Sequence, residues 1–351
     1  MKRERIQWID IAKGIGIILV VYGHISFRPV FWNVWLCSFH MPLFFFMAGV
    51  TYNADKYQKF SVFIKSKVKT LLIPYFIFAC FTWVWNLLLG LLSLFKDGTV
   101  VNWKYQIKQL VGIFVQIRAT DYGIGVWFIP CIFMAFIFLW CIQKLSKISK
   151  WGGIILTIVF LIFGYLYCTY INLKLPWGVD AAFIAVFFME IGVIGQKYLC
   201  KKFGSYKKLI IIGICAFIVN LTFCIANYKI MDHTVGMWSN NYGNLLYFLA
   251  ESFAGIVFII SLSNIVQIKL VSELGRNSIY YYGFHILILN VLSKFALKTI
   301  KIENDVVAFL VCTLLVVITL GLLRIVFPLY NKLYKFTLKV IERKKLNNEI
   351  I

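Results

Sequence analysis

Ten long apolar segments, separated by short polar stretches, constrain this 351-residue chain more than any other feature. A helix needs about 20 apolar residues to cross the hydrocarbon core of a bilayer. Hydrophobic residues make up 61% of the chain and charged residues 14%, whereas soluble domains are about half apolar and a quarter charged. We therefore expect an all-α polytopic membrane protein, one domain over residues 1–351, with about ten transmembrane helices at 11–28, 34–52, 70–95, 125–143, 152–171, 178–196, 208–227, 243–263, 278–295 and 305–327.

The net charge of +22 indicates orientation in a membrane rather than a nucleic acid partner, because the basic residues fall between the apolar segments. With both termini cytoplasmic, the inner loops and tails hold 24 Lys and Arg residues and the outer loops hold 10. This bias predicts cytoplasmic termini in a multi-pass cell membrane protein, for which we expect a bacterial plasma membrane. The first apolar segment is interpreted as a transmembrane helix that stays in the protein, rather than as a secretory signal that is cleaved off. The basic segment 331–351 is interpreted as a helix on the inner leaflet.

The longest predicted loop, residues 96–124, contains a stretch at 101–117 that alternates apolar and basic residues. This pattern predicts a helix in the loop. It is either an amphipathic helix in the membrane interface or an ordinary surface helix.

Ionisable residues at membrane depth are costly, so each is a functional candidate. Three of them lie in the first predicted span or directly before it, and two share a face. Lys13 and His24 are 11 residues apart, about 1100° or three turns plus about 20°, and roughly 16 Å apart along the axis. This face suits a long anionic donor that enters from the cytoplasm. The full set of candidates is Asp10, Lys13, His24, His40, Asp180, Glu190, Glu251, His285 and Arg324.

Simpler roles remain open for the same residues. Asp10 and Lys13 are three residues apart and can pair at the helix end, and Lys13 can extend to the headgroups. His24 can be a buried, hydrogen-bonded histidine. His40 lies at a similar predicted depth and can share a proton network with it. We expect no metal site, and the nine cysteines are interpreted as small buried hydrophobes.

Two sequence stretches carry a family resemblance: WIDIAKGIGIILVVYGH at 8–24 and CSFHMPLFFFMAG at 37–49. The run from Arg5 to Gly49 resembles the acyltransferase-3 family of membrane O-acyltransferases, closest to its branch of fucose 4-O-acetylase-like polysaccharide acetylases. In this family the first helix carries a basic residue that is followed, after ten intervening residues, by a histidine. The corresponding residues here are Lys13 and His24, with lysine where arginine is more usual. Later stretches are similar in family order: KTLLIPYFIF at 69–78, VWFIP at 126–130, LPWGVDAAFIAVFFMEIG at 175–192 and LGRNSIYYYGFH at 274–285.

The resemblance implies acyl transfer, with acetyl-CoA as the cytoplasmic acyl donor and a sugar hydroxyl as the acceptor. The family's essential pair carries over to His24 and Lys13, and we group Asp10 with them as catalytic. His24 is expected to act as general base or to carry the acetyl group transiently. Lys13 is expected to hold a phosphate of coenzyme A as a point charge, without arginine's bidentate fork.

Four further residues are candidates for acceptor binding: His40, Trp127, Asp180 and Glu190. Structural roles are the alternative. Trp127 can stack on a sugar or anchor a span at the interface, and Asp180 can bind a hydroxyl or cap a helix. Glu190 is expected to be protonated or paired if buried. For His285, a structural hydrogen bond is the favoured role.

Three classes of function remain in competition. The leading prediction is an O-acetyltransferase that acts on a cell-surface polysaccharide or its lipid-linked precursor, with the bilayer, acetyl-CoA and the glycan as partners. A transporter or flippase of a glycan intermediate is the alternative, but it leaves the Lys13-x10-His24 spacing unexplained. A membrane sensor is the third.

Overall fold

A computed structural model describes residues 6–97, 101–199 and 205–348 of the chain. Within these ranges all regular elements are helices, and a single isolated bridge joins Gly236 and Asn241. The predicted all-α polytopic class is confirmed. Among the described residues, eight helices are long and apolar enough to cross a membrane: Val30–Val50, Phe60–Leu92, Phe128–Ile148, Lys150–Ile171, Pro176–Leu199, Tyr206–Met231, Leu245–Ile265 and Asp305–Val340. Helices suit this solvent because they satisfy their backbone hydrogen bonds internally.

The first and ninth predicted spans form helices but do not meet this standard. Helix α1 (Gln7–Gly23) has 17 residues, so it is about 25 Å long and shorter than the roughly 30 Å hydrocarbon core. It ends before the predicted boundary at residue 28. Helix α13 (Ser278–Thr299) has 22 residues but carries His285, Asn290 and Lys294. Eight of the ten predicted segments therefore qualify by length and composition, and the cytoplasmic termini stay a prediction.

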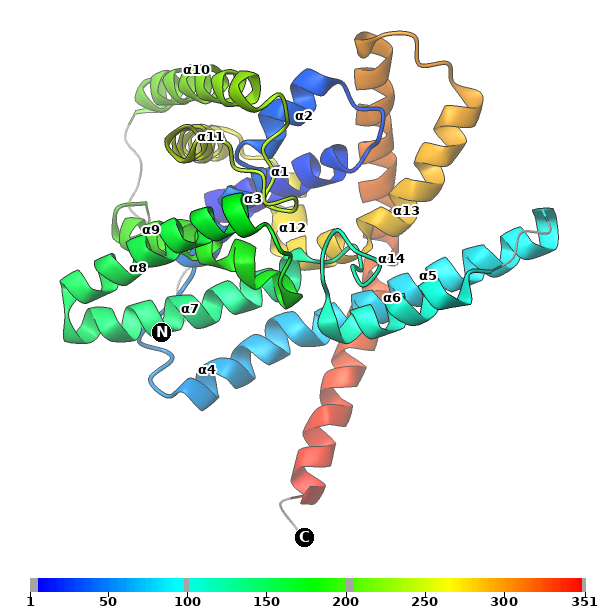
Figure 1. Ribbon diagram of the computed structural model, residues 1–351, viewed down its shortest axis with the longest axis horizontal. Helices are drawn as coiled ribbons and strands as arrows, with labels where there is room; N and C mark the ends of the chain where they lie inside the picture. Colours follow the sequence, from blue (N-terminus) through cyan, green and yellow to red (C-terminus); the bar gives the residue numbers. More distant parts are fainter. Residues whose placement is uncertain (1–5, 98–100, 200–204, 349–351) are drawn as a thin grey trace.

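Helix α1 lies at the centre of the molecule (Figure 1), where it contacts α11 (Leu245–Ile265), α12 (Lys269–Arg276) and α13. Its backbone approaches α12 very closely. A Cβ on Gly14 would lie 2.0 Å from the Val271 carbonyl oxygen, and one on Gly275 would lie 1.7 Å from that of Asp10. The absence of a side chain at Gly14 and at Gly275 thus lets the two helices come this close.

The second predicted span is two helices, α2 (Val30–Cys37) and α3 (His40–Val50). The segment Val30–Val50 as a whole is long and apolar enough to cross a membrane, as predicted for 34–52, but a turn at Ser38 and Phe39 interrupts its helix. The Ser252 hydroxyl donates to the Ser38 carbonyl at 2.7 Å, and the Asn220 amide donates to the Ser38 hydroxyl at 3.0 Å. Non-helical backbone at this depth is stable only when protein groups satisfy it. The break places His40 in the first turn of α3.

Helices α4 (Phe60–Lys67) and α5 (Ile73–Asp97) are joined by a π-helical turn, η1 (Val68–Leu72). Helix α6 (Trp103–Val115) returns along α5 (Figure 1), which confirms the helix predicted at 101–117. Its glutamines Gln106 and Gln109 are buried, while Ile107 and Phe114 are exposed. Its place at the membrane interface stays a prediction.

The remaining helices complete the bundle. Helices α7 (Phe128–Ile148), α8 (Lys150–Leu166) and α9 (Val179–Leu199) pack together, with the turns η2 (Tyr167–Ile171) and η3 (Pro176–Gly178) before α9. Helix α10 (Tyr206–Met231) pairs with α11, and α14 (Asp305–Asn348) packs on α13. Helix α14 continues through Pro328 into the basic segment as one helix, and the last three residues lie outside the described part. The inner-leaflet position of that segment stays a prediction.

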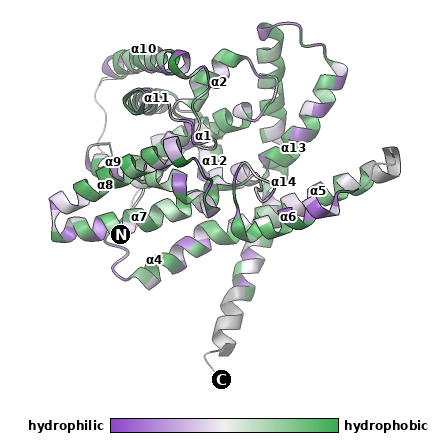
Figure 2. Cartoon of the chain, in the orientation of Figure 1, coloured by the Kyte–Doolittle hydropathy of each residue, from purple (hydrophilic) through white to green (hydrophobic). Residues whose placement is uncertain are grey.

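The outward faces of the helices are apolar, as a lipid environment requires. Ile211 and Ile218 on α10 are 61% and 56% exposed, and Val317 and Ile325 on α14 are 62% and 76% exposed. Figure 2 shows hydrophobic residues over most of the helices. Soluble monomers rarely expose apolar patches this extensive, so these surfaces are those of a protein that lies in the membrane.

Candidate active site

One face of α1 lines two cavities in succession. Lys13, Ile17 and Val20 line an inner cavity of about 340 Å³, and His24 lines an outer cavity of about 950 Å³. These positions follow the helical spacing i, i+4, i+7 and i+11, which keeps them on one side of the helix. The structure thus places the predicted Lys13 and His24 on the same face, in separate spaces.

The inner cavity has the character of an anion site. Besides Lys13, it is lined by Lys67, and the hydroxyl residues Thr51, Thr70 and Ser278 also border it. The Lys67 amine lies 3.3 Å from the centroid of the Phe136 ring, a cation–π geometry that places it against the face of that ring. No carboxylate residue lines this cavity in the part of the chain that the structure describes.

The outer cavity gathers three of the predicted site residues. His24, His40 and Trp127 all line it, together with Arg28 and Asn33 from the region between α1 and α2. Its volume lies within the range of small-molecule sites, and its wall mixes aromatic and polar groups as such sites do. The break after α2 is what brings His40 to this wall.

Met41 and Tyr282 separate the two cavities, because each side chain lines both. The Phe128 backbone N–H donates to the Tyr282 hydroxyl at 3.1 Å, which orients that ring. A ligand that extends from the inner to the outer cavity would pass these two side chains. The cavities are therefore adjacent compartments along α1.

The hydrogen bonds of His24 and His40 select one tautomer for both rings. Nδ1 of His24 lies 2.7 Å from the Val20 carbonyl oxygen, and Nδ1 of His40 lies 2.6 Å from that of Leu36. A carbonyl oxygen only accepts, so each Nδ1 must carry the proton. In the neutral ring Nε2 then keeps its lone pair. Each histidine can therefore accept a proton at Nε2.

His285 joins this group, although its sequence context favoured only a structural hydrogen bond. That bond exists, since Nδ1 donates to the Tyr282 carbonyl oxygen at 2.7 Å. In addition, the His285 ring lies edge-on to His24, with 4.7 Å between their centroids. The ring is fully buried, and its Nε2 has no hydrogen-bond partner among the described residues. His285 is therefore a buried imidazole in direct contact with the exposed ring of His24.

Arg118 is the functional candidate that the sequence did not reveal. It lines the outer cavity from the loop after α6 and is almost completely buried. Its guanidinium binds both Asp180 oxygens, at 2.6 Å and 2.9 Å, and also donates to Asn240 and to the Trp238 carbonyl. Burial acts to lower the pKa of Arg118, but the hydrogen bond and charge of Asp180 outweigh it and raise that pKa. In the sequence, Arg118 looked like any other basic loop residue.

Asp180 has a different position from the one expected for an acceptor ligand. It lies in the first turn of α9, fully buried, and does not line the outer cavity. Its Oδ2 also accepts a hydrogen bond from the Asn240 amide at 2.7 Å. Asp180 therefore positions Arg118 and the 232–244 loop at the cavity wall. Direct contact between Asp180 and the acceptor stays a prediction.

Two other predicted residues lie away from both cavities. Asp10 forms an ion pair with Arg276 at 3.4 Å. Glu190 accepts a hydrogen bond from the Gln143 amide at 2.7 Å within the α7–α9 contact. Neither lines the inner or the outer cavity. Their proposed roles in catalysis and acceptor binding stay predictions.

Comparison with known proteins adds one finding. A model of the acyltransferase-3 family, described as an acyltransferase domain, matches residues 6–324. No match is found among the curated proteins or among the solved structures. The matched range contains both cavities and the three histidines around them.

Proposed function

The chain belongs to the acyltransferase-3 family and is a membrane acyltransferase, and on that premise we propose that it transfers acetyl from acetyl-CoA to a hydroxyl of a cell-surface glycan or its precursor. One observation carries the proposal. His24 presents a proton-accepting Nε2 in the outer cavity, on the same face of α1 that lines the cationic inner cavity. The choice of acetyl and of a glycan follows the resemblance to polysaccharide acetylases.

The inner cavity is the proposed site of the donor's phosphate groups. Lys13 and Lys67 are the two basic side chains there, and Ser278 brings a hydroxyl to the same space, whereas the Thr51 and Thr70 hydroxyls already donate to the carbonyl oxygens of Met47 and Ser66. Lysines bind phosphate as point charges and tolerate several geometries. The flexible thioester arm of the donor would then reach past Met41 and Tyr282 to His24.

The transfer step needs a base for the acceptor hydroxyl. In our proposal, Nε2 of His24 takes the hydroxyl proton while the oxygen bonds to the acyl carbon and the carbon–sulfur bond breaks. The leaving thiolate then takes the proton from the imidazolium, which restores the neutral ring. The hydrogen bond from Nδ1 to Val20 holds the tautomer that this step requires.

The outer cavity is the proposed acceptor site. Trp127 offers a flat apolar surface, and its ring also contacts the Arg118 guanidinium, with 5.6 Å between the guanidinium carbon and the ring centroid. His40, whose Nε2 is also an acceptor, can receive a hydrogen bond from a second sugar hydroxyl. A wall that combines aromatic and polar side chains suits a carbohydrate.

Replacement of Lys13 or Lys67 by alanine should raise the KM for acetyl-CoA about tenfold, because loss of a charge-assisted contact costs roughly 1.5 kcal/mol or more. Lys13→Arg should retain activity, since it keeps the charge. Initial rates at varied acetyl-CoA concentration provide the measurement. Lys65→Ala is the matched control, because Lys65 is exposed on the same helix as Lys67 and lines neither cavity. An unchanged KM in both alanine variants would contradict the proposal that the inner cavity binds the donor.

One assay distinguishes acyl transfer from transport of the glycan. Purified protein in vesicles with radiolabelled acetyl-CoA should release free coenzyme A thiol only when a glycan acceptor is present. The label should appear in the glycan as a base-labile ester. A transporter or flippase would move the glycan without thiol release, and that result would overturn the proposed transfer.

A further inference from the structure

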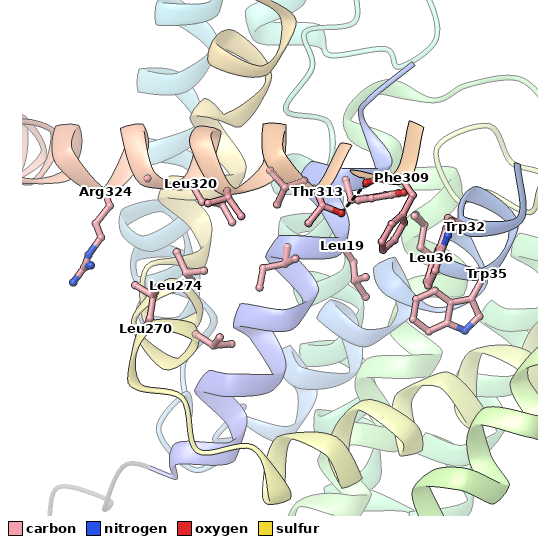
Figure 3. A pocket seen from close by; sticks show the side chains of 16 residues that line it. Leu19, Trp32, Trp35, Leu36, Leu270, Leu274, Phe309, Thr313, Leu320 and Arg324 are labelled. Carbon is pink, nitrogen blue, oxygen red and sulfur yellow. Dashed lines mark hydrogen bonds between the residues drawn. The ribbon is translucent and has the colours of Figure 1, made fainter. Parts of the chain in front are cut away.

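A long apolar groove runs beside the site, on the side of α1 that faces α14. It has a volume of about 430 Å³ and is bordered by α1, α2, α12 and α14. Figure 3 shows Leu19, Leu320 and Phe309 around this space, with Trp32 at one end and Arg324 at the other. Nothing in the proposed reaction uses this groove.

The dimensions of the groove fit a single extended hydrocarbon chain. Phe309 and Arg324 both line it, and these residues are 15 positions apart on α14, which corresponds to about 22 Å. One leaflet contributes roughly half of the 30 Å hydrocarbon core, or about 15 Å. The groove therefore exceeds the depth of one leaflet, and a long tail can lie along its whole length.

The two ends of the groove differ in available charge. At the α12 end, Arg324 is bound to Glu273, with Nη2 to Oε2 at 2.9 Å and Nε to Oε1 at 3.3 Å. Its charge is thus already compensated. The other end adjoins the outer cavity, because Tyr22 lines the groove and the next two residues, Gly23 and His24, line the cavity.

Arg28 is the cation at this junction. Its Nε donates to the Asn33 side-chain oxygen at 2.7 Å, and Trp32, the residue before Asn33, lines the groove. Its Nη1 donates to the Ile25 carbonyl oxygen at 2.6 Å. Arg28 itself lines the outer cavity and forms no ion pair with any carboxylate that the structure describes. A phosphate group fits such a guanidinium.

We propose that the groove binds the hydrocarbon tail of a lipid-phosphate-linked glycan, with the phosphate at Arg28 and the sugar in the outer cavity next to His24. The assignment of this lipid as the acceptor rests on the proposed acetyl transfer. The occupancy of the groove by its tail does not. The charge compensation at Arg324 orients the ligand with its anionic end towards the cavity.

Binding of a defined probe tests the proposal without turnover. The probe is geranylgeranyl phosphate, a C20 polyprenyl monophosphate, added to the full-length protein in detergent and measured by native mass spectrometry. Geranylgeraniol tests the role of the phosphate, and phosphatidylglycerol represents an ordinary anionic bilayer lipid. Gly321→Phe should block the groove, because Gly321 lines it and a Cβ there meets no atom within 4 Å.

Leu322→Phe is the matched control, since Leu322 is the next residue on α14, is 41% exposed and does not line the groove. We expect the phosphate to bind about tenfold more tightly than the alcohol, as one charge-assisted contact provides. Arg28→Gln should abolish that difference. Gly321→Phe should weaken both ligands at least tenfold, and Leu322→Phe should weaken neither.

Two results would overturn the proposal. Equal binding of phosphatidylglycerol would make the groove a site for bulk lipid, and unchanged binding in Gly321→Phe would place the tail elsewhere. Failure of the acetyl transfer is distinguishable from both. If the wild type transfers no acetyl but shows the expected lipid binding, the groove assignment stands and the proposed reaction falls.

Discussion

Replacement of His24 by alanine is expected to lower acetyl transfer by about 10²–10⁴-fold, the usual contribution of a general base. His24 is the imidazole at the end of α1 whose Nδ1 is engaged by Val20 and whose Nε2 can accept the acceptor's proton. The His24 side chain is exposed and lines the cavity, so the packing contact that its removal takes away is the edge-on contact with His285. Transfer of radiolabelled acetyl by purified protein, and O-acetyl NMR signals of the host glycan, are the two measurements.

His233→Ala is the control for this prediction. His233 is exposed at the end of α10, lines neither cavity and bonds only the neighbouring Asp232 carbonyl in the structure. Its replacement should leave both measurements unchanged. Wild-type acetylation by the His24→Ala variant would contradict the assignment of His24 as the base.

Replacement of Asp180 by alanine is expected to destabilise the protein by about 3–5 kcal/mol, the cost typical of leaving one partner of a buried ion pair uncompensated. The Arg118 and Asp180 side chains are 1% and 0% exposed. Without Asp180, the Arg118 charge stays in the interior with only Asn240 and the Trp238 carbonyl as partners. Thermal unfolding of the purified protein in detergent measures the loss. Donor binding at the inner cavity should persist in any folded fraction.

The control variant, Asp55→Ala, breaks an exposed ion pair instead of a buried one. Asp55 pairs with Lys147 at 3.4 Å, and its side chain is 90% exposed. Because exposed pairs contribute about 0–1 kcal/mol, Asp55→Ala should lower the melting temperature far less than Asp180→Ala. Similar shifts in the two variants would show that the Arg118–Asp180 pair does not stabilise the cavity wall.

The helical membrane architecture was predictable because it depends on local properties. Long apolar runs specify helices in a bilayer wherever they occur in the chain, and eight of the ten predicted segments meet the membrane criteria. The alignment of Lys13 with His24 was also local, since helical periodicity sets it. The early end of α1 at Gly23 shortened the span without removing either residue from that face.

The break at Ser38 and the contact between His24 and His285 were not predictable in the same way. The break depends on side chains of α10 and α11: the Ser252 hydroxyl donates to the Ser38 carbonyl oxygen, and the Asn220 amide donates to the Ser38 hydroxyl. His285 reaches His24 because α13 packs against α1. Neither relation leaves a periodic signal in the sequence.

Local sequence properties alone specify the membrane environment of the chain, the helical state of its spans and the polar face of the first helix. Hydropathy and the 3.6-residue period are properties of neighbouring residues, so no partner helix is needed to read them. The packing of the helices, by contrast, is what opens this face into two cavities and makes Asp180 bind Arg118 rather than line the outer cavity. Arg118 and Asp180 are 62 residues apart. Such a contact exists only once helix packing has brought the two elements together and excluded water from the pair.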